Sequence, residues 1–174
     1  LTSAYISNNA TRMGSRIFCN CQKLINIHLP EKLTEIPGTT FANCFSLETI
    51  TIPETVQYYR AYCFDQCRSL VNLTLPEPVY SIERNAFSGL TSIQTLIIPE
   101  GVSGFGLGAF NSCYFYNVSL PSTLRSMGMH CFADCPNLQY IVFPDEYNFF
   151  DHYAFSNCKS IEYIIFPKVE FTLY

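Results

Sequence analysis

Short stretches of alternating apolar and polar residues recur along the whole chain, and most of them end at a proline. The stretches L-E-T-I-T-I-P at 47–53 and L-Q-Y-I-V-F-P at 138–144 are two examples. Apolar residues at alternate positions are typical of a β-strand, and proline ends a strand because it has no N–H group for the ladder. We therefore expect a short strand before each of these prolines: Pro30, Pro53, Pro76, Pro99, Pro121, Pro144 and Pro167.

A second apolar pair follows three and six residues after each of the first six prolines. This spacing indicates a second short strand in every unit. The pairs are Leu33/Ile36, Val56/Tyr59, Val79/Ile82, Val102/Phe105, Leu124/Met127 and Tyr147/Phe150. Each unit then closes with the pattern A-F-x-x-C, in which Phe and Cys would share one face of a helix. We expect a short helical turn there.

The prolines and phenylalanines repeat with an almost constant period. Successive prolines are 23, 23, 23, 22, 23 and 23 residues apart. Phenylalanines recur at one phase of the same period: Phe18, Phe41, Phe64, Phe87, Phe110, Phe132 and Phe155. A fixed period of this length indicates a solenoid, because no single coil could bury its own apolar residues and the coils must stack. Residues 1–174 then form a single array of seven complete repeats and a partial eighth, in which Ser7 stands in the place of a proline.

One repeat is shorter than the others. The 22-residue unit lacks a residue between Cys113 and Phe115, and the preceding stretch 101–110 holds four of the eight glycines. Glycine adds backbone freedom and removes side-chain packing. We expect a local change of curvature or a disrupted ladder between Gly101 and Phe115.

The repeating unit resembles a known family. The pattern A-F-x-x-C-x-x-L-x-x-I-x-I-P-x-x-V-x-x-I, much of which is seen in 41–53 and 132–144, is similar to the BspA-like leucine-rich repeats of surface proteins in host-associated bacteria and parasitic protists. The resemblance covers the whole chain and departs from the pattern at Ser7, at Leu90 and in the 22-residue unit. It implies a β-rich α/β repeat solenoid, a right-handed leucine-rich-repeat superhelix with stacked parallel strands and short helical turns. It also implies adhesion or protein binding at the cell surface, with no enzymatic activity and no cofactor.

Six of the nine cysteines share one phase of the repeat: Cys21, Cys44, Cys67, Cys113, Cys135 and Cys158. Leu90 occupies the same phase in the remaining unit, and leucine can replace a packing residue but neither a metal ligand nor a disulfide partner. Parallel stacked side chains do not bring Cβ atoms to the ~3.8 Å of a disulfide, and a zinc site needs four clustered ligands. We interpret these residues as a column of buried, free structural thiols, with disulfides and metal binding as lesser alternatives.

Composition and charge narrow the function. The chain is 48% hydrophobic with a net charge of −4, so it can bury a large core and lacks the clustered basic residues of nucleic-acid-binding proteins. No apolar run approaches the ~18 residues of a membrane helix. The motifs G-x-S-x-G, P-loop and H-E-x-x-H are absent, so no catalytic residue is assigned. With no initiator methionine and no polar capping repeat, we expect a segment of a longer chain that contacts neighbouring repeats.

The outward positions of the predicted strands change character along the array. They are mostly polar in the first units and become aromatic and aliphatic at Tyr140, Val142, Tyr163 and Ile165. These four residues should lie side by side, because i and i+2 share a face of a strand. Tyrosine is enriched at binding hot spots, so we predict a protein-binding site there. Strand propensity alone, or packing against another part of the parent chain, would explain the same residues.

Two further patterns leave their alternatives open. An acidic column follows the prolines at Glu31, Glu54, Glu77, Glu100 and Asp145. We interpret it as a solvated turn rather than a cation site, since hard cations need several converging oxygens. Sequons occur at Asn9, Asn72 and Asn117, and their use for glycan attachment stays open.

The preferred hypothesis is an adhesin-like array on a cell surface that binds a protein or another host-surface ligand. The alternative is an intracellular leucine-rich-repeat scaffold in the cytoplasm, which free thiols would suit because such compartments are reducing.

Overall fold

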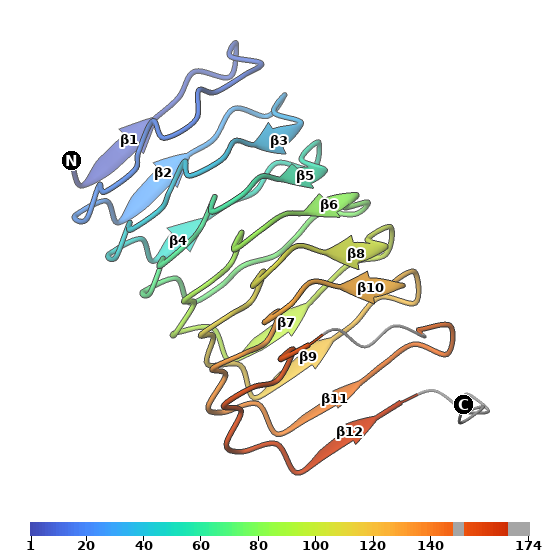
Figure 1. Ribbon diagram of the computed structural model, residues 1–174. Helices are drawn as coiled ribbons and strands as arrows, with labels where there is room; N and C mark the ends of the chain where they lie inside the picture. Colours follow the sequence, from blue (N-terminus) through green and yellow to red (C-terminus); the bar gives the residue numbers. More distant parts are fainter. Residues whose placement is uncertain (148–151, 167–174) are drawn as a thin grey trace.

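The chain winds into a β-solenoid of about seven turns, seen in the computed structural model that describes residues 1–147 and 152–166 (Figure 1). Twelve short strands make up the regular structure of these described residues. Phe150 and Pro167, which the repeat assigns to strand positions, lie outside the described residues. A typical coil passes through a strand, a second strand and a tight turn before the next coil begins, so the same three positions recur along the axis.

The first strand of each coil lies on one side of the solenoid. These strands are β1 (Ser3–Tyr5), β2 (Asn26–His28), β4 (Thr49–Ile50), β7 (Thr95–Ile97), β9 (Asn117–Ser119), β11 (Tyr140–Val142) and β12 (Tyr163–Ile165). They pair in parallel as two sheets, β1-β2-β4 and β7-β9-β11-β12. The central residue of a strand points inward, as buried Ile27, Leu96 and Ile141 do. The strands predicted before the prolines are therefore confirmed, with one exception described below.

The second strand of each coil forms a separate parallel sheet. Its members are β3 (Glu35–Ile36), β5 (Tyr58–Tyr59), β6 (Ser81–Ile82), β8 (Gly104–Phe105) and β10 (Ser126–Met127). They stack in the order β10-β8-β6-β5-β3. Each strand ends at the second residue of an apolar pair predicted from the spacing, which confirms the second strand in these five coils.

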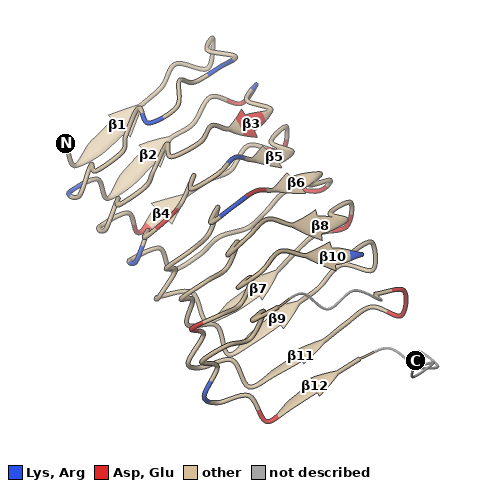
Figure 2. Cartoon of the chain, viewed as in Figure 1, with Lys and Arg blue, Asp and Glu red and all other residues tan. Residues whose placement is uncertain are grey.

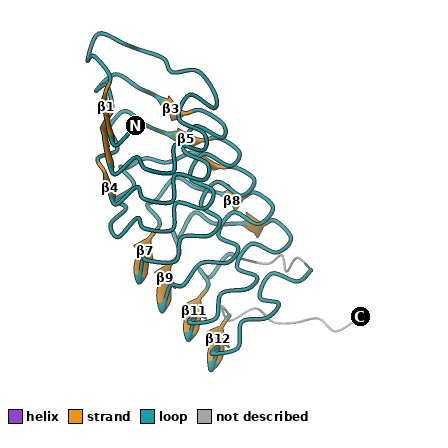
Figure 3. Ribbon diagram, turned by 90° about the vertical axis from the view of Figure 1, so that its left-hand side faces the viewer, coloured by secondary structure: helices purple, strands orange, loops and turns teal. Residues whose placement is uncertain are grey.

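The expected short helical turns are wrong, because the described residues contain no helix (Figure 3). In the coil of Phe41, Thr39 and Asn43 both have φ 60. A right-handed helix requires negative φ values, so these residues cannot belong to one. Backbone N–H groups consequently alternate in direction. The Phe41 N–H donates to Cys63 O of the next coil at 2.8 Å, whereas the Cys44 N–H donates to Phe41 O at 3.0 Å.

The same arrangement recurs at every described turn, where the residues two before and two after the phenylalanine have positive φ. These are Arg16, Asn20, Thr39, Asn43, Tyr62, Gln66, Asn85, Gly89, Gly108, Ser112, His130, Asp134, Tyr153 and Asn157. The N–H groups that point along the axis form a third set of bonds between coils, which we call the turn ladder.

The phenylalanines of the turns stack into a continuous column inside the solenoid. Ring centroids of Phe41 and Phe64 are 5.2 Å apart, and those of Phe87 and Phe110 are 5.7 Å apart with planes 10° from parallel. All four of these rings are fully buried. Because the turn ladder holds each ring directly above the previous one, this column forms the centre of the core.

The ladders continue through the 22-residue unit. β7 and β9 pair in register from Thr95↔Asn117 to Ile97↔Ser119, and β8 pairs with β10 at Gly104 and Phe105. The ladder disruption expected between Gly101 and Phe115 is therefore not found in these pairings, and the local change of curvature, expected as the alternative, stays a prediction. The missing residue falls in a corner between turn and strand, where Phe115 is fully buried in the place of the usual leucine.

The exception lies earlier, where residues 71–75 form no strand. At the other junctions a backbone bond joins the residues just before the first strands, such as Tyr116 N–H to Gln94 O at 2.8 Å. Segment 71–75 keeps this bond on the side of β4, from Val71 N–H to Glu48 O at 3.2 Å, although it does not pair with β4 as a strand. The described residues show no such bond from the Gln94 N–H to Val71 O. Segment 71–75 and β7 therefore face each other unpaired, and we call this place the open junction.

Candidate functional site

The four predicted binding residues lie together on the outer face of β11 and β12. The register places Tyr140 beside Tyr163 and Val142 beside Ile165. The two tyrosine rings stack with centroids 5.6 Å apart and planes 16° from parallel. Exposed fractions are 37% for Tyr140, 47% for Val142, 51% for Tyr163 and 48% for Ile165. We call this group the aromatic patch.

Strand geometry explains the outward position of these side chains. Ile141 lies between Tyr140 and Val142 and is fully buried, so its neighbours must point away from the core. At the end of the strands, the rings of Phe143 and Phe166 stack at 5.3 Å. Phe166 is 38% exposed and extends the apolar surface beyond the aromatic patch.

A hollow of about 520 Å³ lies beside the aromatic patch. Tyr140, Val142, Asn117 and Ser119 contribute to its wall from two neighbouring strands, and Glu100 lies at its edge. A partner side chain seated in this hollow would contact the exposed Tyr140 at the same time. The hollow was not predicted, because its lining residues come from more than one coil and no sequence pattern marks it.

The Glu100 carboxylate is fixed at this edge by the next coil. It accepts hydrogen bonds from the Ser122 N–H at 2.8 Å, the Ser122 hydroxyl at 2.9 Å and the Thr123 N–H at 3.2 Å. The backbone bond from Ser122 is the main reason that the pKa of Glu100 lies below its ordinary 4.5. Glu100 therefore carries its negative charge at neutral pH.

The strands around the aromatic patch carry no charged residue. Figure 2 shows β7, β9, β11 and β12 entirely in the colour of uncharged residues. Burying a charged side chain that has no partner is costly. Because these strands carry no charge, a partner could cover this face without that cost. The surface is therefore suited to an apolar or hydrogen-bonding ligand rather than to a highly charged one.

The six predicted structural cysteines form a column along the core. Cys44, Cys67, Cys113 and Cys135 are buried, Cys21 and Cys158 are half-buried, and all are free thiols. From the second coil onward, each thiol donates to the carbonyl of the phenylalanine in the preceding coil. The Sγ–O distances are 3.2 Å for Cys44, 3.2 Å for Cys67, 3.1 Å for Cys113, 3.3 Å for Cys135 and 2.9 Å for Cys158.

These thiol bonds were not foreseen, since packing alone accounted for the sequence pattern. Burial raises the pKa of the Cys44 and Cys113 thiols from 9.0 to about 12. The hydrogen bond between the Cys135 and Cys158 thiols, together with burial, raises the pKa of Cys135. A nucleophilic cysteine needs its thiolate, so the pKa values of these three buried thiols do not favour a reactive role.

The acidic column and the sequons lie on the surface. All five acidic residues are exposed, and no group of three or more His, Cys, Asp or Glu within 1–147 and 152–166 is placed to hold a metal ion. Asn72 and Asn117 lie on the side of the first strands, and Asn9 is exposed in the first coil. No helix in the described part of the chain has the length and apolar character needed to cross a membrane.

The repeat pattern also decides the family. Residues 1–114 and 105–173 match the profile of the BspA type leucine-rich repeat region, in six copies. The chain belongs to the BspA-type leucine-rich repeat family. BspA-type proteins are in general protein-interaction or surface proteins, and leucine-rich-repeat proteins generally act as scaffolds without enzymatic activity.

Solved structures of other leucine-rich-repeat proteins share the fold. A protein from Bacteroides ovatus ATCC 8483 is 30% identical with a TM-score of 0.87, and the match covers 95% of this chain and 45% of that one. A leucine-rich cell surface protein from Faecalibacterium prausnitzii A2-165 is 26% identical with a TM-score of 0.85, over 98% of this chain and 50% of that one.

A leucine-rich-repeat protein from T. pallidum is 18% identical over 97% of this chain and 70% of that one, and its TM-score of 0.64 shows the fold alone. The chain spans about half the length of the Bacteroides and Faecalibacterium proteins, at 45% and 50%. No curated protein matches it.

Proposed function

We propose that this chain is a non-enzymatic, adhesin-like segment of a cell-surface protein and that it binds a protein partner through the aromatic patch. The observation that carries the proposal is the exposed Tyr140–Tyr163 stack, at 5.6 Å, on a face without charged strand residues. Tyrosine supplies a large rigid contact area with a polar end, which is why it is common at hot spots.

The shape of the site supports a protein ligand. The aromatic patch covers the outer face of two paired strands, and the adjacent hollow of about 520 Å³ can take a protruding side chain. An apolar anchor in a pocket beside exposed aromatic rings is a frequent arrangement in protein interfaces. The fixed carboxylate of Glu100 at the edge would favour a hydrogen-bond donor or a cationic group on the rim of the partner.

The surface location and the absence of catalysis rest on the family. The Faecalibacterium relative is described as a cell surface protein and is 26% identical over 98% of this chain. A host-surface protein is the partner class that such a location brings within reach. The cytoplasmic scaffold remains the alternative, and its partners would be intracellular proteins.

Two tyrosine substitutions test the site. Immobilised host extracellular-matrix and membrane proteins would be screened against the chain by biolayer interferometry, and any binder titrated against Tyr140→Ser and Tyr163→Ser. Each substitution should weaken binding at least fivefold, the equivalent of about 1 kcal/mol. Thermal stability should change little, because both side chains lie on the surface.

Thr49→Ser is the matched control, since Thr49 is an exposed residue of a first strand at the other end of the array. It should leave binding unchanged. Unchanged affinity in both tyrosine variants, together with a loss of stability in a longer parent chain, would show that the aromatic patch packs against another part of that chain. Binding only to intracellular proteins would favour the scaffold.

A further inference from the structure

Segment 71–75 pairs as a strand with neither β4 nor β7, so it separates the first strands into two sheets, and at the open junction the array stays joined behind it. On the turn side, the Asn85, Phe87 and Gly89 N–H groups donate to Leu107, Ala109 and Asn111 O at 2.9, 2.9 and 2.8 Å. In the second sheet, β6 and β8 pair only at Ile82↔Phe105. On the side of the first strands, the described residues show no pairing at all. The bonding between these coils thus decreases from the turn to the first strands.

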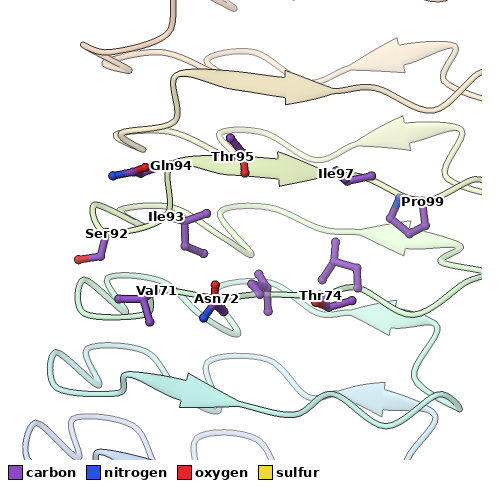
Figure 4. A pocket seen from close by; sticks show the side chains of 11 residues that line it. Val71, Asn72, Thr74, Ser92, Ile93, Gln94, Thr95, Ile97 and Pro99 are labelled. Carbon is purple, nitrogen blue, oxygen red and sulfur yellow. The ribbon is translucent and has the colours of Figure 1, made fainter.

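The unpaired edges enclose a hollow of about 650 Å³ (Figure 4). Val71, Asn72 and Thr74 line one wall, and Thr95 and Ile97 of β7 line the other. At some other junctions an N–H to C=O bond forms at the end of the first strands, such as Ile6 to His28 at 3.2 Å and Ile98 to Ser119 at 3.1 Å. The described residues show no such bond from the N–H groups of Leu29, Ile52 and Leu120.

At the open junction, two such bonds are missing among the described residues. The equivalent donors are the N–H groups of Leu75 and Gln94, and the equivalent acceptors are the carbonyls of Ile97 and Val71. All four residues line the hollow. The walls therefore offer backbone donors and acceptors in the directions that a parallel ladder would use.

We propose that the open junction binds an extended peptide segment of a partner protein, which pairs as a β-strand with the edge of β7 or of segment 71–75. Unpaired strand edges are templates for another chain, and natural proteins usually block them with lysine, proline or a bulge. No residue lining this hollow is charged, and Pro76 and Pro99 follow the edges rather than interrupt them.

The walls also specify the side chains of the peptide. Leu73 is partly buried and Ile93 is 2% exposed, so the hollow has an apolar floor. Asn72, Thr74 and Thr95 are exposed at its mouth. The matching ligand is a stretch of about four residues with apolar, β-branched side chains at alternate positions and uncharged polar residues between them. This inference rests on backbone groups and does not depend on the aromatic patch.

Hydrogen exchange of the intact chain tests the proposal with synthetic peptides. The probes are capped hexapeptides that alternate Val or Ile with Thr, and the controls are the same peptides with N-methyl groups at alternate residues. The control peptides keep the side chains but cannot donate to a ladder. Binding should slow exchange of the Leu75 or Gln94 amide at least tenfold, and N-methylation should weaken binding at least tenfold.

A substitution on the edge provides the second test. Thr95→Lys adds a charge at the mouth of the hollow and should abolish protection by the peptide. Asn26→Lys, at an exposed position of β2 that has paired strands on both sides, should leave it intact. Tyr140→Ser should also leave it intact, which separates this result from that of the aromatic patch.

Each contrary result overturns the proposal. Slow exchange at Leu75 and Gln94 in the free chain would mean that the ladder closes on itself. Equal binding of the N-methylated peptides would mean a side-chain groove rather than a strand site. Protection that rises with protein concentration alone would replace the peptide with a second copy of this chain. Absence of any protection by the peptides would show that the edge does not bind an added strand.

Discussion

Two neighbouring junctions of this solenoid behave in opposite ways. β7 and β9 are linked by the shortened unit, yet they pair along their whole length from Thr95↔Asn117 to Ile97↔Ser119. Segment 71–75 and β7 are linked by a unit of regular length, yet they do not pair. Ladder continuity in this array is therefore set by local bonding at each junction and not by the number of residues per coil.

One cause of the difference lies just after the prolines. The Thr123 hydroxyl donates to Val102 O of the preceding coil at 2.8 Å, and Thr55 donates to Glu31 O at 2.9 Å. Both threonines stand two residues after the proline of their coil. In the two intervening coils this position holds Pro78 and Gly101, and neither has a side chain that can donate a hydrogen bond. The open junction thus lacks a side-chain bond that helps to hold its neighbours together.

The largest effect should follow ionisation of the buried thiols. Burial raises the pKa values of Cys44 and Cys113 in the folded chain from 9.0 to about 12. Protonated thiols therefore stabilise the fold fully below pH 9, and this contribution is lost as the pH rises toward 12. Since the Cys113 bond to Phe87 crosses the open junction, we expect unfolding to begin there. Circular dichroism from pH 8 to 12 measures the loss, and a constant unfolding free energy across this range would contradict it.

Removing a ring from the phenylalanine column should be the next largest effect. Phe87→Ala leaves a cavity in the full core and should lower the unfolding free energy by about 3–5 kcal/mol. Because the turn side is the main connection at the open junction, this variant should unfold in two steps under urea. Phe41→Ala, at a junction paired on all three sides, should cost a similar amount but keep one transition. A single transition for both variants would remove the distinction between the junctions.

A smaller effect is expected from the turn ladder itself. Gly89 has φ 75, and an added Cβ would clash with the side-chain amide nitrogen Nε2 of Gln66. Gly89→Ala should lower the unfolding free energy by about 1–2 kcal/mol, because a left-handed backbone is strained for alanine. Gly14→Ala, where an added Cβ meets nothing within 4 Å, is the matched control and should be near neutral. Urea melts would compare the two.

The smallest effect should come from a network of surface ion pairs beside the sheet of second strands. Arg60 contacts Glu35 at 2.7 Å and Glu83 at 2.8 Å, so it links three successive coils. These side chains are 36–42% exposed, and solvent screening limits the value of such pairs. Arg60→Met should cost less than about 1 kcal/mol and leave the open junction unaffected. A cost as large as that of Phe87→Ala in the same urea melts would show that the network is a main support.

The sequence predicted both sets of strands because they follow an alternation that each coil must satisfy to bury its core. It failed at the turn, where residue spacing suggested a helix. A signal for the true geometry was present, since Asn20, Asn43, Gly89, Asp134 and Asn157 occupy the left-handed position and such residues tolerate positive φ.

The candidate site could be assembled from register alone, because Tyr140 and Tyr163 occupy the same phase of adjacent repeats. The hollow beside it and the open junction could not. Leu73 and Leu75 fit the strand pattern as well as the residues of any other coil, and the pairing of a strand depends on groups in its neighbours that its own sequence does not contain. The thiol bonds were hidden for the same reason, since their acceptors are backbone carbonyls.

The uneven bonding of the coils also has a mechanical consequence. Ladder bonds run along the axis of the solenoid, so a force that pulls its ends apart loads the junctions in series, and extension begins at the one with the fewest bonds. At the open junction the load falls on the turn side, which makes that edge a hinge about which the two sheets of first strands separate. Stretching the array would widen the hollow before any coil unravels, so tension and access to the edge of β7 would increase together.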